Sequence, residues 1–207
     1  MALGHVELIQ LAATDQVIAE DARIAAAELA RLRRLAQWLL LLASAGSPDF
    51  LQLAPVEAGS VVLDTVERWG HIPRRWRLGE VAEATVLADR DQLATALDAL
   101  LENAVAHTAE GDRIEIGVYL EQGGPVFGVT DDGCGIPAAE RDRIFGRFAR
   151  ARADRGRAVD GFGLGLPVVQ AIAEAHHGSV RVRSTEGHGA TLEIQLPAAP
   201  EPEHVSS

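Results

Sequence analysis

The chain has 207 residues, which is enough for one well-buried domain and a smaller appendage. Apolar residues make up 47% and charged residues 24%, as in ordinary soluble globular proteins. A formal net charge of −11 argues against a nucleic-acid partner, and a single cysteine, Cys134, excludes an intrachain disulfide.

The sequence contains no recognisable membrane or secretion signal. Its most apolar run, residues 38–43, is too short to span a bilayer, and no basic cluster of a secretory signal follows Met1. The cysteine content also fits a reducing compartment. These features predict a cytoplasmic chain without direct membrane contact, and a longer, membrane-bound parent protein would carry its anchor outside these residues.

Residues 1–46 are predicted to form part of a helical hairpin. Apolar residues recur at alternating steps of four and three from Ile18 onward, the heptad pattern of helices that pack along one seam. The seam consists of Ile18, Ala22, Ala25, Leu29, Leu32, Ala36, Leu39 and Ala43. A shorter apolar stretch, residues 3–11, precedes it across a turn at residues 14–16, so the two helices should run antiparallel. We expect a second copy of the chain or another helical partner to cover the seam, and the chain's own domain is the alternative.

Residues 47–197 alternate between helical and strand periodicity, which predicts an α/β domain. Helices are expected at about 58–69, 91–107 and 163–177, strands at 112–121 and 126–130, one or two strands within 74–89, and a strand hairpin at 180–184 and 190–196. Residues 198–207 are rich in proline, glutamate and serine and are expected to be disordered.

The helix at 91–107 carries polar side chains beside its apolar face. Ala99, Asn103 and His107 are spaced four residues apart and therefore align along one flank. The amide oxygen of Asn103 is a hard ligand that suits Mg²⁺. An isolated asparagine at such a position more often bonds to neighbouring backbone, so the spacing leaves both interpretations open.

Three glycine-rich segments follow this helix. Asp131 comes directly after an apolar strand, and its carboxylate accepts hydrogen bonds only, so it can select a ligand with an exocyclic amine such as adenine. Residues 161–166 open the next helix, where free backbone amides can bind phosphate. Each segment is also compatible with an ordinary turn, and residues 184–191 fit a simple hairpin turn better than a binding loop.

Taken together and in order, five motifs resemble those of the catalytic module of sensor histidine kinases, within the wider superfamily of gyrase and mismatch-repair ATPases. They are the N box, Leu97-x-x-Leu100-Leu101-Glu102-Asn103-Ala104-x-x-His107-Thr108; the first glycine box, Asp131-x-Gly133-x-Gly135-Ile136-Pro137; the phenylalanine box, Ile144-Phe145-x-Arg147-Phe148; the second glycine box, Gly161-x-Gly163-Leu164-Gly165-Leu166; and the terminal box, Gly187-x-Gly189-Ala190-Thr191. Five motifs in the family's order make chance a poor explanation.

The resemblance implies a fold and a division of the chain. The fold is a two-layer α/β sandwich, a mixed sheet with helices on one face, preceded by an antiparallel helical hairpin. Residues 1–46 would be a partial dimerisation domain, residues 47–197 the ATP-binding catalytic domain, and residues 198–207 a disordered tail.

The resemblance also implies a role for each matching residue. Asn103 would hold Mg²⁺ and phosphate oxygens, and Asp131 would bond the adenine amine with Thr191 in support. Arg147 would reach the polyphosphate or the incoming acceptor, so it joins Asn103 as a catalytic residue. The other implied nucleotide contacts are His107, Gly133, Gly135, Ile136, Gly161, Gly163, Leu164, Gly165, Leu166 and Gly189. Residues 138–160, which are rich in arginine, would form a mobile lid.

The sequence departs from the family pattern at several points. The phospho-accepting motif His-Glu-x-x-x-Pro is absent, and His5 lacks the proline, so the acceptor is expected upstream of Met1 or on another protein. Ala99 stands where gyrase-type ATPases have a water-activating glutamate, which predicts slow ATP hydrolysis. His176 and His177 fit favourable charge at a helix C-terminus better than metal binding.

The resemblance therefore implies the ATP-binding kinase module of a two-component sensor histidine kinase, which donates the γ-phosphoryl group of Mg-ATP to a histidine outside this chain. The implied partners are a histidine-bearing kinase segment, a response regulator and, through the hairpin, a second copy or a helical partner. The alternative is an ATP-responsive regulatory module without kinase activity of its own. A serine kinase of the anti-sigma type fits less well, because those proteins resemble the bare module without a heptad hairpin.

Overall fold

The computed structural model describes residues 16–146 and 162–198. The chain divides into two compact units, residues 1–43 and 44–207.

A long helix, α2 (Gln16–Ser44), makes up the described part of the first unit and confirms the predicted helix that precedes the α/β domain. Much of its apolar seam is exposed, with Ile18 at 51%, Leu32 at 55% and Leu39 at 46% of their possible surface. The other arm of the predicted hairpin, residues 3–11, lies outside the described residues. Within the described ranges, no helix is long and apolar enough to cross a membrane.

The second unit is built around a mixed five-stranded sheet in the order β2-β4-β5-β7-β6. The strands are β2 (Arg75–Val81), β4 (Arg113–Glu121), β5 (Gly124–Asp131), β6 (Ser179–Ser184) and β7 (Ala190–Gln195). Strands β2 and β4 pair in parallel, and the other neighbours are antiparallel. This arrangement confirms the mixed sheet expected from the sequence.

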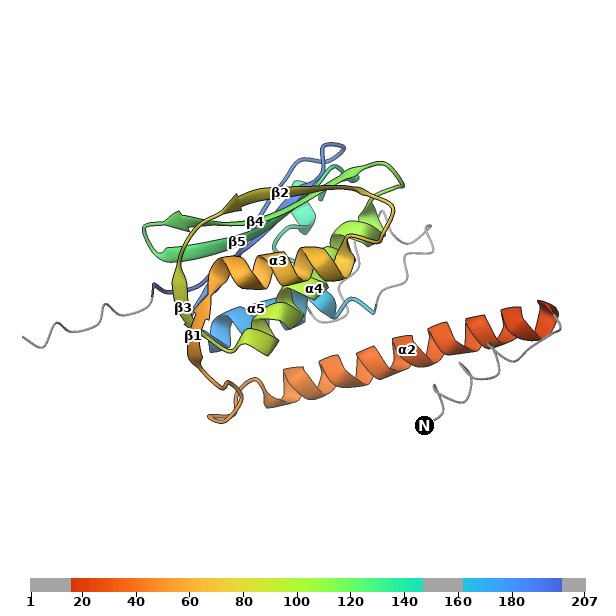
Figure 1. The fold of residues 1–207 in the computed structure, drawn as a ribbon, viewed down its shortest axis with the longest axis horizontal. Helices are drawn as coiled ribbons and strands as arrows, with labels where there is room; N and C mark the ends of the chain where they lie inside the picture. Colours follow the sequence, from red (N-terminus) through yellow and green to blue (C-terminus); the bar gives the residue numbers. More distant parts are fainter. Residues whose placement is uncertain (1–15, 147–161, 199–207) are drawn as a thin grey trace, which may run out of the picture. The chain divides into compact units, whose positions relative to one another are not determined.

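Three helices cover one face of this sheet, as Figure 1 shows. They are α3 (Ala58–Trp69), α4 (Arg90–His107) and α5 (Gly165–Ala175), and a short 3-10 turn, η1 (Ala138–Glu140), follows β5. The helix-facing side of β4 consists of Ile114, Ile116 and Val118, all fully buried. The alternation of buried and partly exposed residues along β4 is the period-two pattern of a strand covered on one face.

A second, two-stranded sheet was not predicted. In it, β1 (Ala54–Glu57) pairs antiparallel with β3 (Thr85–Ala88), and the paired residues Val56 and Val86 are both buried. Local periodicity could not indicate β1, because the strand is four residues long, contains Pro55 and finds its partner only after the whole of α3 and β2.

Candidate functional site

Helix α4 brings the N-box residues to the edge of the core. Asp89 caps its N-terminus, because the side chain accepts hydrogen bonds from the backbone amides of Asp91 and Gln92, each at 3.0 Å. One face of α4 is fully buried, with Leu97 and Leu100 at its centre. Asn103 and His107 therefore lie in the last turns, partly buried, on the flank that the sequence predicted.

Asp131 ends the helix-facing row of side chains on β5. It pairs across the sheet with the buried Ile114, so its carboxyl group lies on the same side of the sheet as the helices and is 4% exposed. The Oδ1 atom accepts a hydrogen bond from the Gly133 amide at 2.9 Å. Burial raises the pKa of this carboxyl group, and the Gly133 amide and the nearby His107 act in the opposite direction.

Gly133 holds the first glycine box against the end of α4. A Cβ atom at this position would overlap the backbone carbonyl oxygen of His107 and lie 2.7 Å from Asp131 Oδ1, so only glycine allows the approach. The neighbouring Cys134 places its Sγ atom 3.9 Å from His107 Nδ1. The N box and the first glycine box, which are separated in sequence by two strands, thus meet at one place.

The turn between β6 and β7 closes the other side of the same loop. A Cβ atom at Gly189 would overlap the backbone oxygen of Asp131. The Ser184 hydroxyl accepts a hydrogen bond from the Ile136 amide at 2.7 Å and donates one to the Gly189 carbonyl oxygen at 2.6 Å. Gly135 also lies close to the backbone of this turn, so the terminal box packs directly against the first glycine box.

Thr191 lies on the opposite side of the sheet from the Asp131 carboxyl group. It pairs in register with Thr130, and the two hydroxyl groups are 3.0 Å apart. Asp131 pairs instead with Ala190. Thr191 therefore contacts Thr130, the residue before Asp131 on β5, and its hydroxyl group does not lie on the side of the sheet where the Asp131 carboxyl group lies.

The second glycine box leads into α5 as predicted. Gly163 has a φ of 67° directly before the helix, and the buried Leu164 is its N-cap residue. The helix then begins at Gly165 and Leu166. The first amides of a helix have no partner within the helix, so this end is suited to phosphate oxygens.

A cavity of about 240 Å³ is lined mainly from the face of the sheet turned away from the helices, and its lining also includes Asp131 and Gly189 of the predicted site. Its walls include Arg113 and Arg183 as well as Thr130 and Thr191. Arg113 pairs with Asp132, and Arg183 pairs with the buried Glu193. Because both arginines already have carboxylate partners, the cavity has no excess positive charge for a polyphosphate.

Several residues of the predicted site lie outside the described residues. They are Arg147 and Gly161, together with most of the predicted lid. Within the described residues, no group of three or more histidine, cysteine, aspartate or glutamate side chains is arranged to hold a metal ion. The described site thus consists of α4, the loop after β5, the β6–β7 turn and the start of α5.

Sequence reasoning missed Asp89 and misread His176. The sequence suggested a charged histidine at a helix end, but His176 is 4% exposed and burial lowers its pKa. Its ring forms hydrogen bonds with the backbone of Asp89 and of Ile172. An aspartate immediately before a strongly helical segment is the usual signature of a helix cap and would have identified Asp89.

The described residues fit a purine nucleotide. The backbone at Gly133 packs against His107, and the backbone at Gly189 packs against Asp131, more closely than a Cβ atom would allow. The buried carboxyl group of Asp131 supplies hydrogen-bond acceptors for an exocyclic amine, and the first amides of α5 supply donors for phosphate.

Comparisons with known proteins agree with this geometry. The model of the family described as histidine kinase-, DNA gyrase B-, and HSP90-like ATPase matches residues 88–200. The sensor-like histidine kinase SenX3 of Mycolicibacterium smegmatis is 32% identical over 195 residues, which cover 91% of this chain and 48% of SenX3. The probable sensor histidine kinase TcrY of Mycobacterium tuberculosis is 33% identical over 199 residues, which cover 94% of this chain and 42% of TcrY. The chain thus spans about half the length, or less, of these relatives.

A solved structure extends the similarity to the fold. The crystal structure of full-length ShkA in complex with AMPPNP matches with a TM-score of 0.76 and 26% identity, over 95% of this chain and 42% of that chain.

Proposed function

Because the chain belongs to the family of histidine kinase-, DNA gyrase B-, and HSP90-like ATPases, we propose that it is the ATP-binding kinase module of a two-component sensor histidine kinase, and that it donates the γ-phosphoryl group to a histidine outside this chain. The observation that carries this proposal is the meeting of α4 with the loop after β5 at Gly133. That contact joins a buried carboxylate to the polar end of α4.

The base of the nucleotide is assigned to Asp131. A carboxylate accepts a hydrogen bond from the adenine amine, whereas the corresponding oxygen of guanine has no proton to donate. Gly133 and Gly135 bring the loop beside this carboxylate into close contact with the backbone of His107 and Thr185. Ile136 is partly buried in the same loop and offers the apolar surface that a purine ring needs.

The phosphates are assigned to the start of α5 and the end of α4. The amides of Gly163, Leu164, Gly165 and Leu166 lie at or before the start of α5 and suit phosphate oxygens. Asn103 and His107 lie on α4, and we assign the amide oxygen of Asn103 to Mg²⁺. When bound, Mg²⁺ neutralises charge on the phosphate oxygens. Gly161 and Arg147 belong to this part of the site by their motifs alone.

Among the described residues of the site, the position one turn before Asn103 offers no group that would activate water. Ala99, one turn before Asn103, is 3% exposed and carries no carboxylate. Transfer to a histidine needs no such base, because a neutral imidazole nitrogen is itself the nucleophile: a P–N bond forms, the P–O bond to ADP breaks, and ADP leaves. We therefore assign phosphoryl transfer, with slow ATP hydrolysis as a side reaction.

The proposal also includes the partners and the organisation of the chain. The exposed seam of α2 suits a second copy or another helix, within a dimerisation segment at residues 1–46. The phosphorylated histidine would then pass its group to a response regulator. A regulatory module without kinase activity is less favoured, because the relatives that match most of this chain are named as sensor histidine kinases.

The decisive experiment supplies the missing acceptor. The full chain is mixed with a helical fragment bearing the His-Glu-x-x-x-Pro motif and with radiolabelled Mg-ATP. We expect label on the histidine with the wild-type chain and at least a hundredfold less with Asn103→Asp, whose added negative charge disturbs the metal and phosphate contacts. Binding of ATP without any transfer would favour the regulatory alternative, and normal transfer by Asn103→Asp would refute the assignment of Asn103.

A further inference from the structure

One buried contact joins the start of α4 to the end of α5. It lies at the end of this helix pair that is away from the glycine loops. The backbone amide of Asp89, just before α4, donates a hydrogen bond to His176 Nε2 at 2.9 Å. His176 follows the last residue of α5. Since the start of α4 meets the end of α5, the two helices run antiparallel along their contact (Figure 1).

The direction of this bond defines the charge state of the histidine. Nε2 accepts a hydrogen bond, so the proton of the neutral ring is on Nδ1, which donates to the Ile172 carbonyl oxygen at 2.8 Å. Burial lowers the pKa of His176, and the carboxylate of Asp89 opposes that shift. The neutral ring thus bridges the last turn of α5 and the residue before α4.

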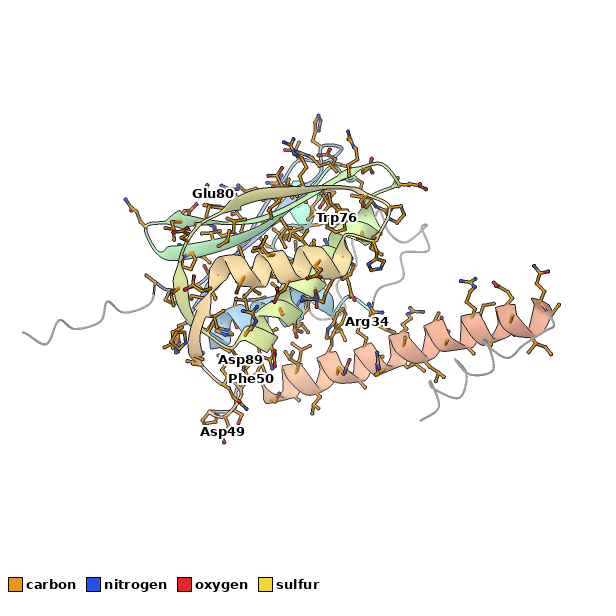
Figure 2. All side chains as sticks on the ribbon, in the orientation of Figure 1. Arg34, Asp49, Phe50, Trp76, Glu80 and Asp89 are labelled. Atoms are coloured by element: carbon orange, nitrogen blue, oxygen red, sulfur yellow. The ribbon has the colours of Figure 1, made fainter. Side chains whose placement is uncertain are left out.

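Asp89 also holds the chain segment that enters the domain. Its Oδ1 atom caps α4, and its Oδ2 atom accepts a hydrogen bond from the backbone amide of Gln52 at 2.9 Å. Gln52 lies in the short stretch between α2 and β1. Figure 2 shows Asp89 at the point where α4 begins. One residue, 8% exposed, therefore contacts the entering segment, α4 and the end of α5.

The consequence lies at the other end of the helix pair. Helix α4 is 18 residues long, roughly 27 Å, and its last turns carry Asn103 and His107. Helix α5 begins beside Gly163 and Leu164. Packed helices move as nearly rigid bodies, so a change of angle at the joined end changes the spacing between these two groups.

We propose that Asp89 and His176 are positioning residues that set the spacing of the phosphate-binding ends of α4 and α5, and that the Gln52–Asp89 bond couples this spacing to the segment arriving from α2. The inference rests on the proposed function, since it concerns the affinity of the same site for nucleotide. It adds two residues that contact neither the base nor the phosphates.

The first test replaces the ring. His176→Phe fills the same space but leaves the Asp89 amide without an acceptor, whereas His176→Gln retains an acceptor near the Nε2 position. The dissociation constant of Mg-AMPPNP is measured by calorimetry on the full chain, at a temperature where circular dichroism shows every variant fully folded. We expect His176→Phe to bind about tenfold more weakly and His176→Gln to bind within about threefold of wild type.

A matched control separates positioning from stability. Val61→Ala removes buried methyl groups from α3 and lowers the unfolding temperature without touching the Asp89–His176 contact. We expect it to leave the dissociation constant unchanged. Equal affinity of His176→Phe and Val61→Ala, both fully folded, would overturn the positioning role.

The second test addresses the entering segment. Asp89→Asn keeps an oxygen that caps α4, because asparagine is as good a cap as aspartate, but its second terminal atom is a donor and cannot accept from Gln52. We expect several-fold weaker nucleotide binding with the helix content of wild type. Unchanged affinity would remove Gln52 from the proposal, and absence of binding by the wild-type chain would overturn the proposed function itself.

Discussion

The two ends of the α4–α5 helix pair differ in burial and in hydrogen bonding. At one end Asp89 and His176 are buried and bonded to each other and to backbone groups. At the other end the polar side chain of Asn103 is partly exposed, and the chain around it runs through glycine-rich loops. A ligand-binding end needs space and free hydrogen-bond donors, whereas the end that fixes its geometry has its hydrogen bonds satisfied within the protein.

The largest effect is expected at Gly133, because the loop that carries it must lie close to the end of α4 at His107. Gly133→Ala should weaken binding of Mg-AMPPNP at least a hundredfold, because the new Cβ atom would overlap the His107 carbonyl oxygen and push the loop away from α4. Calorimetry measures the change. Gly46→Ala is the matched control, since nothing lies within 4 Å of a Cβ there. Normal affinity of Gly133→Ala would show that the loop does not bind the nucleotide.

Cys134 offers a probe of the open end that needs no mutation. It is the one cysteine of the sequence and lies between Gly133 and Gly135. Saturating Mg-ADP should slow its alkylation by iodoacetamide about tenfold, because the nucleotide would cover the loop when most of the protein is bound. Mg-GTP at the same concentration should protect far less. Equal rates with and without Mg-ADP would place the nucleotide elsewhere.

A smaller effect, on the free energy of unfolding, is expected from a strained residue next to His176 at the end of α5. His177 has a φ of 59°, a left-handed conformation that costs a residue with a Cβ atom, and it is exposed. His177→Gly should raise the free energy of unfolding by about 0.5–1 kcal/mol, as measured by urea denaturation. Glu174→Gly, exposed within α5, should lower it by a similar amount. A loss of stability in His177→Gly would contradict this account.

The joined end should also make stability depend on pH. The pKa of His176 is lowered in the folded protein by burial, and Asp89 and His177 are the titratable side chains near it. As the pH falls below about 6.5, the unfolded chain binds a proton that the folded chain resists. The contribution of His176 is therefore complete above that pH and is lost as the pH falls toward the folded pKa. Urea denaturation of wild type and His176→Gln across this range measures the difference, and parallel profiles would contradict the prediction.

Much of the fold follows from local patterns. The sequence predicted α3 at 58–69 and strands at 112–121 and 126–130, and the structure contains α3, β4 and β5 at these places within one or two residues. It predicted α5 two residues longer at each end, because nothing local showed that Gly163 adopts a left-handed φ before the helix or that His177 does so after it. The small β1–β3 sheet was missed because its strands pair across a long separation in sequence.

The candidate site divides in the same way. Spacing alone placed Asn103 and His107 on one flank of α4, and the order of the motifs indicated Asp131, Gly133 and the start of α5, since these are properties of residue type and local conformation. Only the tertiary structure decided that Thr191 faces away from Asp131, since the two residues lie on neighbouring strands and the register of β5 and β7 fixes their faces.

The role of His176 also depends on the tertiary structure. Its partner Asp89 is 87 residues away in sequence, and only the packing of α5 beside α4 brings them together. Burial then reverses the expected charge of the ring, because removing the imidazole from water disfavours its protonated form. Local sequence patterns thus indicated the helices, the strands of the main sheet and the chemistry that they carry, whereas the packing determined which residues meet and in what state of charge.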